Sequence, residues 1–573
     1  MTITATEQQT KVLQLVQAMF GAAPGAIILQ AGQEFLSANR SVTDLAQILS
    51  GTVAFYGKSY APSLTPTQFA DTFINDLVGN RAASADKALV SGYVVAKMAA
   101  GASQAAIISE VTQLLGTVPP ANTSWGAAAT YYNTSVVTRI LDNLVGDTVS
   151  VATKAVGVGA VVDLLASGQS IGNVVALLIT ALDGIDHSDV TWGKAAALFD
   201  NRIEVAKYYS VDKAGAATDV GTLQQVLSLV TDAASSVAIA KAMFNAPLSG
   251  TAQDGYLAGA TVFVDMNGDG VLNPGEVSVT SDAQGDFTLP VGAFGRIVAT
   301  GGTDIATNLP FTGSMTAPAG STMVTPLTTL MQSMVESGAT VEQAQTNVLS
   351  ALGLPATINL QTLDPISQAL GTGSTADKAA ATQVQAATAK VANILALGAA
   401  AIQGASSTTS ATDAIAQMVT ALANNFATAT TVVDLTQGAT LRSVMTEAAA
   451  ATSGVVTGFA ASLDNIATLM SSANTSVNTA ISANPTDFTA ALSQIAKVQV
   501  VVQSSMADSV ETGMATGNIA ATVTGFTGSA LDSAVAVAVA RDLAADKPAN
   551  GGTPTDTVAP SITSGASTST RKL

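Results

Sequence analysis

The chain has 573 residues, no cysteine and one histidine, and its 22 basic and 40 acidic residues leave a formal net charge of −18. The absence of cysteine excludes disulfides and thiolate chemistry. The acidic balance, without clusters of Lys and Arg, argues against binding to nucleic acid or to an anionic membrane.

The length predicts several domains. The first residues, MTITATEQQTKVLQLVQAMFG, contain no cationic segment followed by an apolar core, so we expect no cleaved secretory signal. No run of apolar residues reaches the roughly 18 that a membrane span needs, so we also expect no transmembrane segment.

An internal repeat dominates the first part of the chain. DLVGN at 76–80 returns as NLVGD at 143–147, and two further pairs of markers keep the same offset of 67 residues: Gly101 and Ser103 with Gly168 and Ser170, and Trp125-Gly126 with Trp192-Gly193. A constant offset predicts two copies of one unit, at about 69–137 and 136–209. Apolar residues at helical spacing predict that the unit is helical, and we assign residues 1–245 to a helical quasi-repeat domain.

The two repeat tryptophans allow two interpretations. Exposed aromatic rings bind sugars by stacking, but a tryptophan at the start of an amphipathic helix more often packs between repeats, which we favour for Trp125 and Trp192. His187, in the polar segment DGIDHSDV, is interpreted as a surface residue rather than a ligand or a base.

The pattern changes from helical to extended at about residue 250. Val262 and Val264 alternate with Thr261 and Phe263, and a second alternating segment surrounds a turn at 282–285. These segments predict a small β-sandwich over residues 246–312.

Between the two extended segments lies the one dense group of oxygen donors in the chain. Residues 265–276, DMNGDGVLNPGE, have the spacing of a calcium loop with Gly270 at its sixth position. The predicted ligands of Ca²⁺ are Asp265, Asn267, Asp269, Val271 through its carbonyl, Asn273 through a water, and Glu276. The alternative is a metal-free turn, since Gly, Asn and Asp also form turns. We expect Asp254 and Asp282 to lie in turns rather than in the ligand shell.

A strand, rather than a helix, is predicted to enter this loop. Paired EF-hand helices open when calcium binds, whereas a loop held between strands becomes rigid. An intracellular calcium sensor is therefore disfavoured.

The rest of the chain is predicted to be helical. Thr325 and Pro326 form a cap and a first helical position, and an Ala/Thr/Ser-rich stretch with helical periodicity comes after them, so residues 313–545 are assigned to a helical domain. Residues 546–573 are interpreted as a disordered linker or a truncated boundary. The predicted fold class is multidomain and mainly α: an N-terminal helical quasi-repeat domain, a small β-sandwich with an EF-like calcium loop, and a C-terminal Ala/Thr-rich helical region.

Two parts of the chain resemble known proteins. The segment DGYLAGATVFVDMNGDGVLNPGE, with TSDAQGDFTLPVG after it, resembles a prealbumin-like β-sandwich of large secreted bacterial surface proteins, and APAGSTMVTPLTTL and VEQAQTNVLSALGL resemble the helical segments next to that sandwich. The N-terminal quasi-repeats, with AALFDNRIEVAKYY, are similar to the helical N-terminal regions of surface-layer and RTX-family proteins.

This resemblance implies a protein that is exported by type I secretion and folded outside the cell by calcium. In such relatives the N-terminal helical domain anchors to lipopolysaccharide and the C-terminal part builds a lattice. The chain departs from the pattern because it has no glycine-rich nonapeptide repeats, and its TDTVAPSITS segment resembles the opening of an Ig-like domain. Either the protein is a fragment of something longer, or these modules are absent.

We therefore expect a non-enzymatic, self-associating structural protein of the bacterial cell surface, assembling with calcium into a surface layer or matrix. The alternative is an adhesin or glycan-binding surface module. An extracellular polysaccharide hydrolase is less favoured, because the sequence offers no specific pair of carboxylates: Asp142, Asp147 and Asp200 are better interpreted as helix caps or solvated residues.

Overall fold

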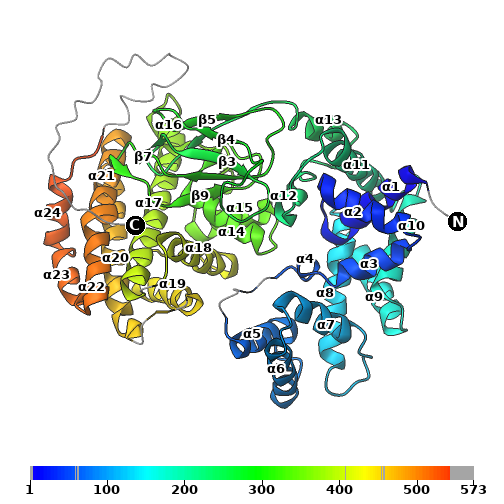
Figure 1. Ribbon diagram of the computed structural model, residues 1–573. Coiled ribbons are helices and arrows are strands. Elements are labelled where there is room, and N and C mark those ends of the chain that lie inside the picture. The colour runs from blue at the N-terminus through cyan, green and yellow to red at the C-terminus, as the bar shows by residue number, and fades with distance from the viewer. Residues whose placement is uncertain are drawn as a thin grey trace.

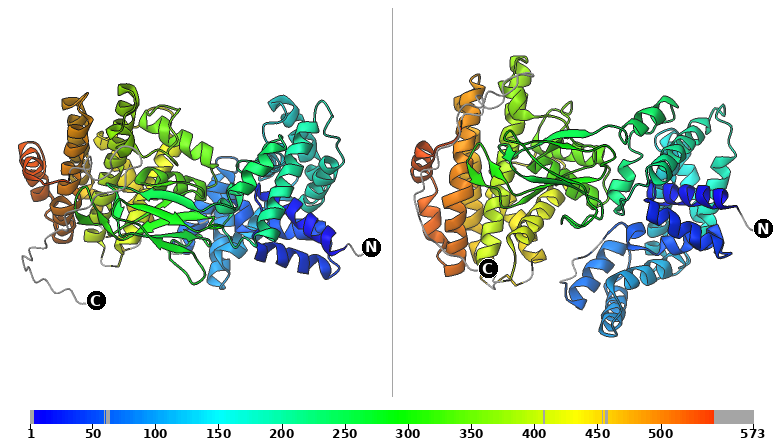
Figure 2. Two further views of the ribbon diagram at one scale, coloured as in Figure 1. Left: turned by 90° about the horizontal axis from the view of Figure 1, so that it is seen from above. Right: turned by 45° about the horizontal axis from the view of Figure 1, so that its top comes forward.

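The computed structural model describes residues 4–58, 60, 64–406, 408–452, 454–455 and 458–541. The protein is mainly helical, and its strands lie between an N-terminal group of helices and a C-terminal group (Figure 1). Two further views show the same order (Figure 2). The segment predicted as a linker, 546–573, lies outside the described residues.

We call the helices before the strands the N-terminal array. They are α1 Ala5–Phe20, α2 Ala26–Ser37, α3 Val42–Ser50, α4 Val53–Tyr56, α5 Pro66–Val78, α6 Ser84–Ala99, α7 Gln104–Gly116, α8 Gly126–Val145, α9 Val151–Ala166, α10 Ile171–Asp183, α11 Gly193–Lys207, the π-helix η1 Tyr208–Asp212, α12 Val220–Gln225 and α13 Ser235–Ala242.

The predicted repeat is confirmed, because α6, α7 and α8 begin 67 residues before α9, α10 and α11. Equivalent residues of the two copies form the same kinds of helix ends. The hydroxyls of Ser103 and Ser170 cap the N-termini of α7 and α10, and the glycines two positions earlier have φ values of +90° and +95°. A left-handed residue followed by a serine cap ends one helix and starts the next.

The aromatic markers of the repeat pack rather than stand free. Trp125 and Trp192 precede α8 and α11 and lie half-buried against apolar clusters of the array, as predicted. His187 is exposed, with its Nε2 2.8 Å from Oδ2 of Asp200. Trp125 also lines a cavity of about 500 Å³ together with residues of α5, α6 and α7.

We call residues 248–324 the β region. Its strands are β1 Leu248–Ala252, β2 Leu257–Ala258, β3 Thr261–Asp265, β4 Ser278–Thr280, β5 Asp286–Leu289, β6 Arg296–Thr300, β7 Thr303–Asp304, β8 Leu309–Pro310, β9 Ser314–Ala317 and β10 Met323–Val324. The sheet orders are β10-β1-β5, β2-β7-β8 and β4-β3-β6-β9. Buried apolar residues of the first and last sheets form one cluster, so the strands enclose a small core of their own.

Strand pairing continues past residue 312, where the sequence predicted that the sandwich ends. β9 pairs with β6 and β10 pairs with β1, so the last strand residue is Val324. These strands are short and their partners lie far away in the sequence. Their own residues therefore give little periodicity by which to predict them.

The C-terminal helices start at the predicted Thr325 cap, with Pro326 in the first turn. They are α14 Pro326–Glu336, α15 Val341–Leu352, α16 Pro365–Leu370, α17 Thr375–Ala405, α18 Ala411–Thr428, α19 Gly438–Ala451, α20 Phe459–Ala483, α21 Phe488–Val501, the π-helix η2 Val502–Met506, α22 Ala507–Thr516, α23 Ile519–Gly525 and α24 Ser529–Val537.

Helix α17 is the centre of this group. By length and hydropathy it could cross a membrane, but 89% of its most apolar window is buried inside the protein. It packs against α16, α18, α20 and α22, as a core helix does.

The repeat generates a test on paired glycines. Gly126 and Gly193 start equivalent helices, and an added Cβ would overlap the carbonyl oxygens of Pro120 and His187. Gly92 and Gly159 lie inside α6 and α9 with nothing within 4 Å of an added Cβ. We expect G126A and G193A to lower the free energy of unfolding by about 1–3 kcal/mol and G92A and G159A to raise it by about 0.5–1 kcal/mol.

Urea denaturation followed by circular dichroism measures these changes. Opposite effects within a pair, G126A against G193A or G92A against G159A, would contradict the proposed equivalence of the repeats.

Candidate functional site

The predicted metal loop, residues 265–276, connects β3 to β4. Asp265 is the last residue of β3 and pairs with Arg296 of β6, while Ser278 begins β4. The prediction that strands flank the loop is confirmed. This placement fixes both ends of the loop to one sheet.

The ends of the loop are closed by carboxylates that accept backbone hydrogen bonds. Oδ1 of Asp265 accepts from the N–H of Gly268 and Oδ2 from the N–H of Gly270, each at 2.7 Å. Glu276 accepts from the N–H groups of Met266 at 2.8 Å and Asn273 at 2.9 Å. Gly268 and Gly270 have φ values of +81° and +76°, a backbone that favours glycine and turns their N–H groups toward Asp265.

The middle of the loop gathers the other predicted ligands. Nδ2 of Asn273 donates to Oδ2 of Asp269 and to the carbonyl of Val271, both at 2.8 Å, and Nδ2 of Asn267 donates to the same Asp269 oxygen at 3.0 Å. Hydrogen bonds from the N–H of Val271 and then from the two amides lower the pKa of Asp269. That carboxylate therefore stays ionised at neutral pH.

These residues fit a hard cation by the chemistry of their donors. A half-turn of the Asn273 amide would replace its Nδ2 by Oδ1 beside the Asp269 carboxylate and the Val271 carbonyl, whereas Oδ1 of Asn267 already accepts from the N–H of Asp269 at 3.1 Å. Asp265 and Glu276 keep lone pairs beyond those that the backbone uses. Within the described part of the chain, however, no three acidic or histidine side chains converge as a metal-ligand group, because these two carboxylates turn toward N–H groups.

Arg296 is a site residue that the motif does not include. Its guanidinium, with a side chain 7% exposed, bonds both the fully buried Asp265 and the half-exposed Glu336 at the end of α14. Burial alone would lower the pKa of Arg296, but the charges of Glu336 and Asp265 raise it. The signal in the sequence is a single basic residue within the apolar strand RIVAT.

The loop also contacts the N-terminal array. The N–H of Thr218 donates to the carbonyl of Met266 at 2.9 Å. Asp219, the N-cap of α12, lies against Gly268 of the loop. A Cβ added to Gly268 would be 3.2 Å from the Cβ of Asp219. Burial raises the pKa of Asp219, and its Oδ2 is a buried acceptor with no hydrogen-bond partner among the described residues.

A cavity of about 400 Å³ lies beside this contact and is lined by residues of the array and of α14, including Arg139, Asp219 and Glu336. We call the contacts of the loop with α12 and α14 the junction. The loop thus lies where the array, the β region and the C-terminal helices meet.

The two other carboxylates that the sequence placed in turns have different roles. Asp282 accepts from the N–H groups of Gln284 and Asp286 in a turn, both at 2.9 Å, as expected. Asp254 also comes after a strand, but it is 4% exposed and its role extends beyond a turn. Its oxygens accept from Nε2 of Gln499 at 3.0 Å and of Gln503 at 2.8 Å.

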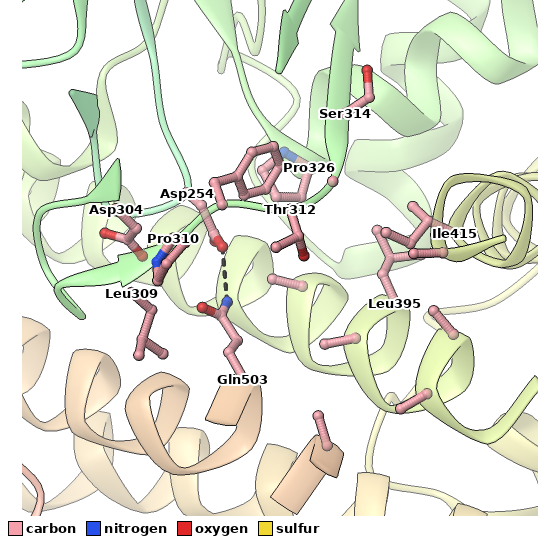
Figure 3. Close-up of a pocket in the computed structure, with 18 of the residues that line it drawn as sticks. Asp254, Asp304, Leu309, Pro310, Thr312, Ser314, Pro326, Leu395, Ile415 and Gln503 are labelled. Atoms are coloured by element: carbon pink, nitrogen blue, oxygen red, sulfur yellow. Dashed lines mark hydrogen bonds between the residues drawn. The ribbon is translucent and has the colours of Figure 1, made fainter. Parts of the chain in front are cut away.

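Asp254 shares a cavity of about 230 Å³ with Asp304 of β7, which is 2% exposed (Figure 3). We call it the acidic cavity. Burial, and then the charge of Asp254, raises the pKa of Asp304 to about 7, and burial raises the pKa of Asp254. Sequence patterns could not pair these residues, because strand pairing and a helix from the far end of the chain bring them together.

Comparison with known proteins gives no further assignment: no protein-family model, curated protein or solved structure matches this chain.

The buried Asp304 predicts a pH dependence of stability. The pKa of Asp304 is about 7 in the folded protein and roughly 3.9 in an unfolded chain. The contribution of Asp304 to the free energy of unfolding is therefore fully present below about pH 4 and is lost as the pH rises through about 7. D304N keeps the shape and removes the titration. The quantity to follow is the free energy of unfolding of D304N minus that of wild type. We expect this difference to rise by at least about 1.4 kcal/mol, the value of one pKa unit, between acidic and mildly alkaline pH.

Urea unfolding across this range provides the measurement. The difference between the two curves belongs to the pair of Asp304 and Asp254, because the charge of Asp254 also raises the pKa of Asp304. Parallel curves for the two proteins would contradict the assignment.

Proposed function

We propose that this protein is an extracellular structural scaffold of a bacterial cell surface, which binds calcium at residues 265–276 and assembles into a surface layer or matrix. The observation that carries the proposal is the position of this oxygen-rich loop at the junction. Thr218 of the array bonds its backbone, and Arg296 connects its first carboxylate to Glu336 of α14. A cation there would stiffen contacts between all three regions.

Calcium would act in this scheme as a structural ion. Asp265, Asn267, Asp269, Val271, Asn273 and Glu276 would hold it, and it would neutralise the excess of carboxylate charge over Arg296. Extracellular sites bind calcium with dissociation constants of roughly 10⁻⁴ to 10⁻³ M, so such a site fills outside the cell and stays empty in the cytosol. A concentration a hundredfold above that constant would stabilise the folded chain by about 2.7 kcal/mol.

The surface of the repeat supports self-association. Leu89 of α6 and Val156 of α9 occupy equivalent positions 67 residues apart, and they are 74% and 75% exposed. Val151, at the start of α9, is 86% exposed. Apolar side chains repeated on equivalent exposed helices form the kind of surface that another protein copy covers.

The alternatives have less support. A glycan-binding adhesin would use open aromatic faces, whereas Trp125 and Trp192 are half-buried. A polysaccharide hydrolase would use paired carboxylates in an open cleft, whereas Asp254 and Asp304 are 4% and 2% exposed. Anchoring to lipopolysaccharide and export by type I secretion stay predictions from the resemblance.

The experiment is assembly of the purified full chain with millimolar calcium and with a chelator, followed by electron microscopy and sedimentation. We expect ordered assemblies with calcium and dispersed particles without it. D269N and E276Q should each need at least about tenfold more calcium, because each removes a ligand charge. D163N, an exposed aspartate of α9, is the matched control.

Assembly that is unchanged by chelation would overturn the proposal. Calcium binding by calorimetry without assembly would keep the metal site but reject the scaffold function.

A further inference from the structure

We propose that the acidic cavity is a binding site for a small organic cation, a primary ammonium group on a short apolar body. This site is separate from the 265–276 loop, and the inference does not depend on the function proposed above.

The cavity holds acidic groups without a matching base. Asp254, Asp304, Asp508 and Glu511 line it, and no lysine or arginine is among the described lining residues. The ion pairs found in the described part of the chain include neither Asp254 nor Asp304. Arg541 donates its backbone N–H to the carbonyl of Ala306 nearby, but the residue is exposed and does not line the cavity.

An acceptor inside the cavity has no donor. Oδ1 of Asp304 accepts from the N–H of Ala306 at 2.8 Å, and hydrogen bonding by Thr307 lowers the pKa of this carboxyl, but no donor among the described residues meets hydrogen-bond geometry at its buried Oδ2. Buried acceptors normally have partners, and one without a donor destabilises the folded protein. A group rich in N–H donors would satisfy the Asp304 oxygen.

The polar wall is held in place by two helical turns. Gln499 of α21 and Gln503 of η2 both donate to Asp254, and η2 is a π-helix, a local widening that often occurs at functional sites. Figure 3 shows Gln503 directed at Asp254 with Asp304 beside them. The carboxylate of Asp254 is therefore fixed in orientation before any ligand arrives.

The opposite wall selects an organic cation over a metal ion. It is built from alanines of α17 together with Leu395 and Ile415 (Figure 3). Calcium takes six to eight oxygen ligands, whereas no three acidic or histidine side chains in the described residues form such a group. An ammonium group needs only a few acceptors, and its carbon chain can lie along the apolar wall.

The test uses butylammonium as the probe, with butan-1-ol as its uncharged counterpart and calcium alone as the competing cation. Isothermal titration calorimetry on the full chain at neutral pH should show one butylammonium site per chain and no binding of butan-1-ol. D304N should weaken binding at least about tenfold, roughly 1.4 kcal/mol. D163N should leave it unchanged.

A second variant, A396L, tests the location without changing any charge, because Ala396 lines the apolar wall. We expect it to weaken butylammonium binding by a similar factor while circular dichroism shows an unchanged fold. Equal binding of butan-1-ol, displacement of the probe by calcium, absence of any binding to wild type, or full binding to A396L would each overturn the proposal.

Discussion

The buried ion pair between Arg296 and Asp265 is the interaction on which the central part of the molecule depends. Two strands place these residues opposite each other, and the guanidinium then reaches Glu336 at the end of α14. An unpaired charge at either buried position would cost several kcal/mol, so the sheet register, the start of the loop and the end of α14 are held together.

This pairing also defines how the loop can respond to a cation. Asp265 already has Arg296 and two N–H groups as partners, while Asp269 and the asparagine amides bond one another and the backbone of Val271 at the exposed end of the loop. Calcium would therefore add charge compensation to a loop that is already folded. The proposed role is to stiffen an existing junction, beside a cavity of about 400 Å³ that leaves the contact between the array and α14 loosely packed.

The sequence predicted what depends on local pattern. The cap at Thr325, the packed tryptophans and the strands around the loop all result from residue types at short spacing. Long-range pairing was not predictable. Arg296 meets Asp265 through strand register, Asp304 meets Asp254 through a sheet and a helix, and β9 and β10 extend the β region beyond residue 312. The motif predicts a set of oxygen donors but not the arginine that bonds one of them.

The most direct test is amide hydrogen exchange of the full chain with and without calcium. The account predicts slower exchange within 265–276 and also around Thr218 and in the last turn of α14, because the loop bonds Thr218 directly and is connected to Glu336 of α14 through Arg296. Protection confined to the loop, or none at all, would contradict the claim that calcium tightens the junction.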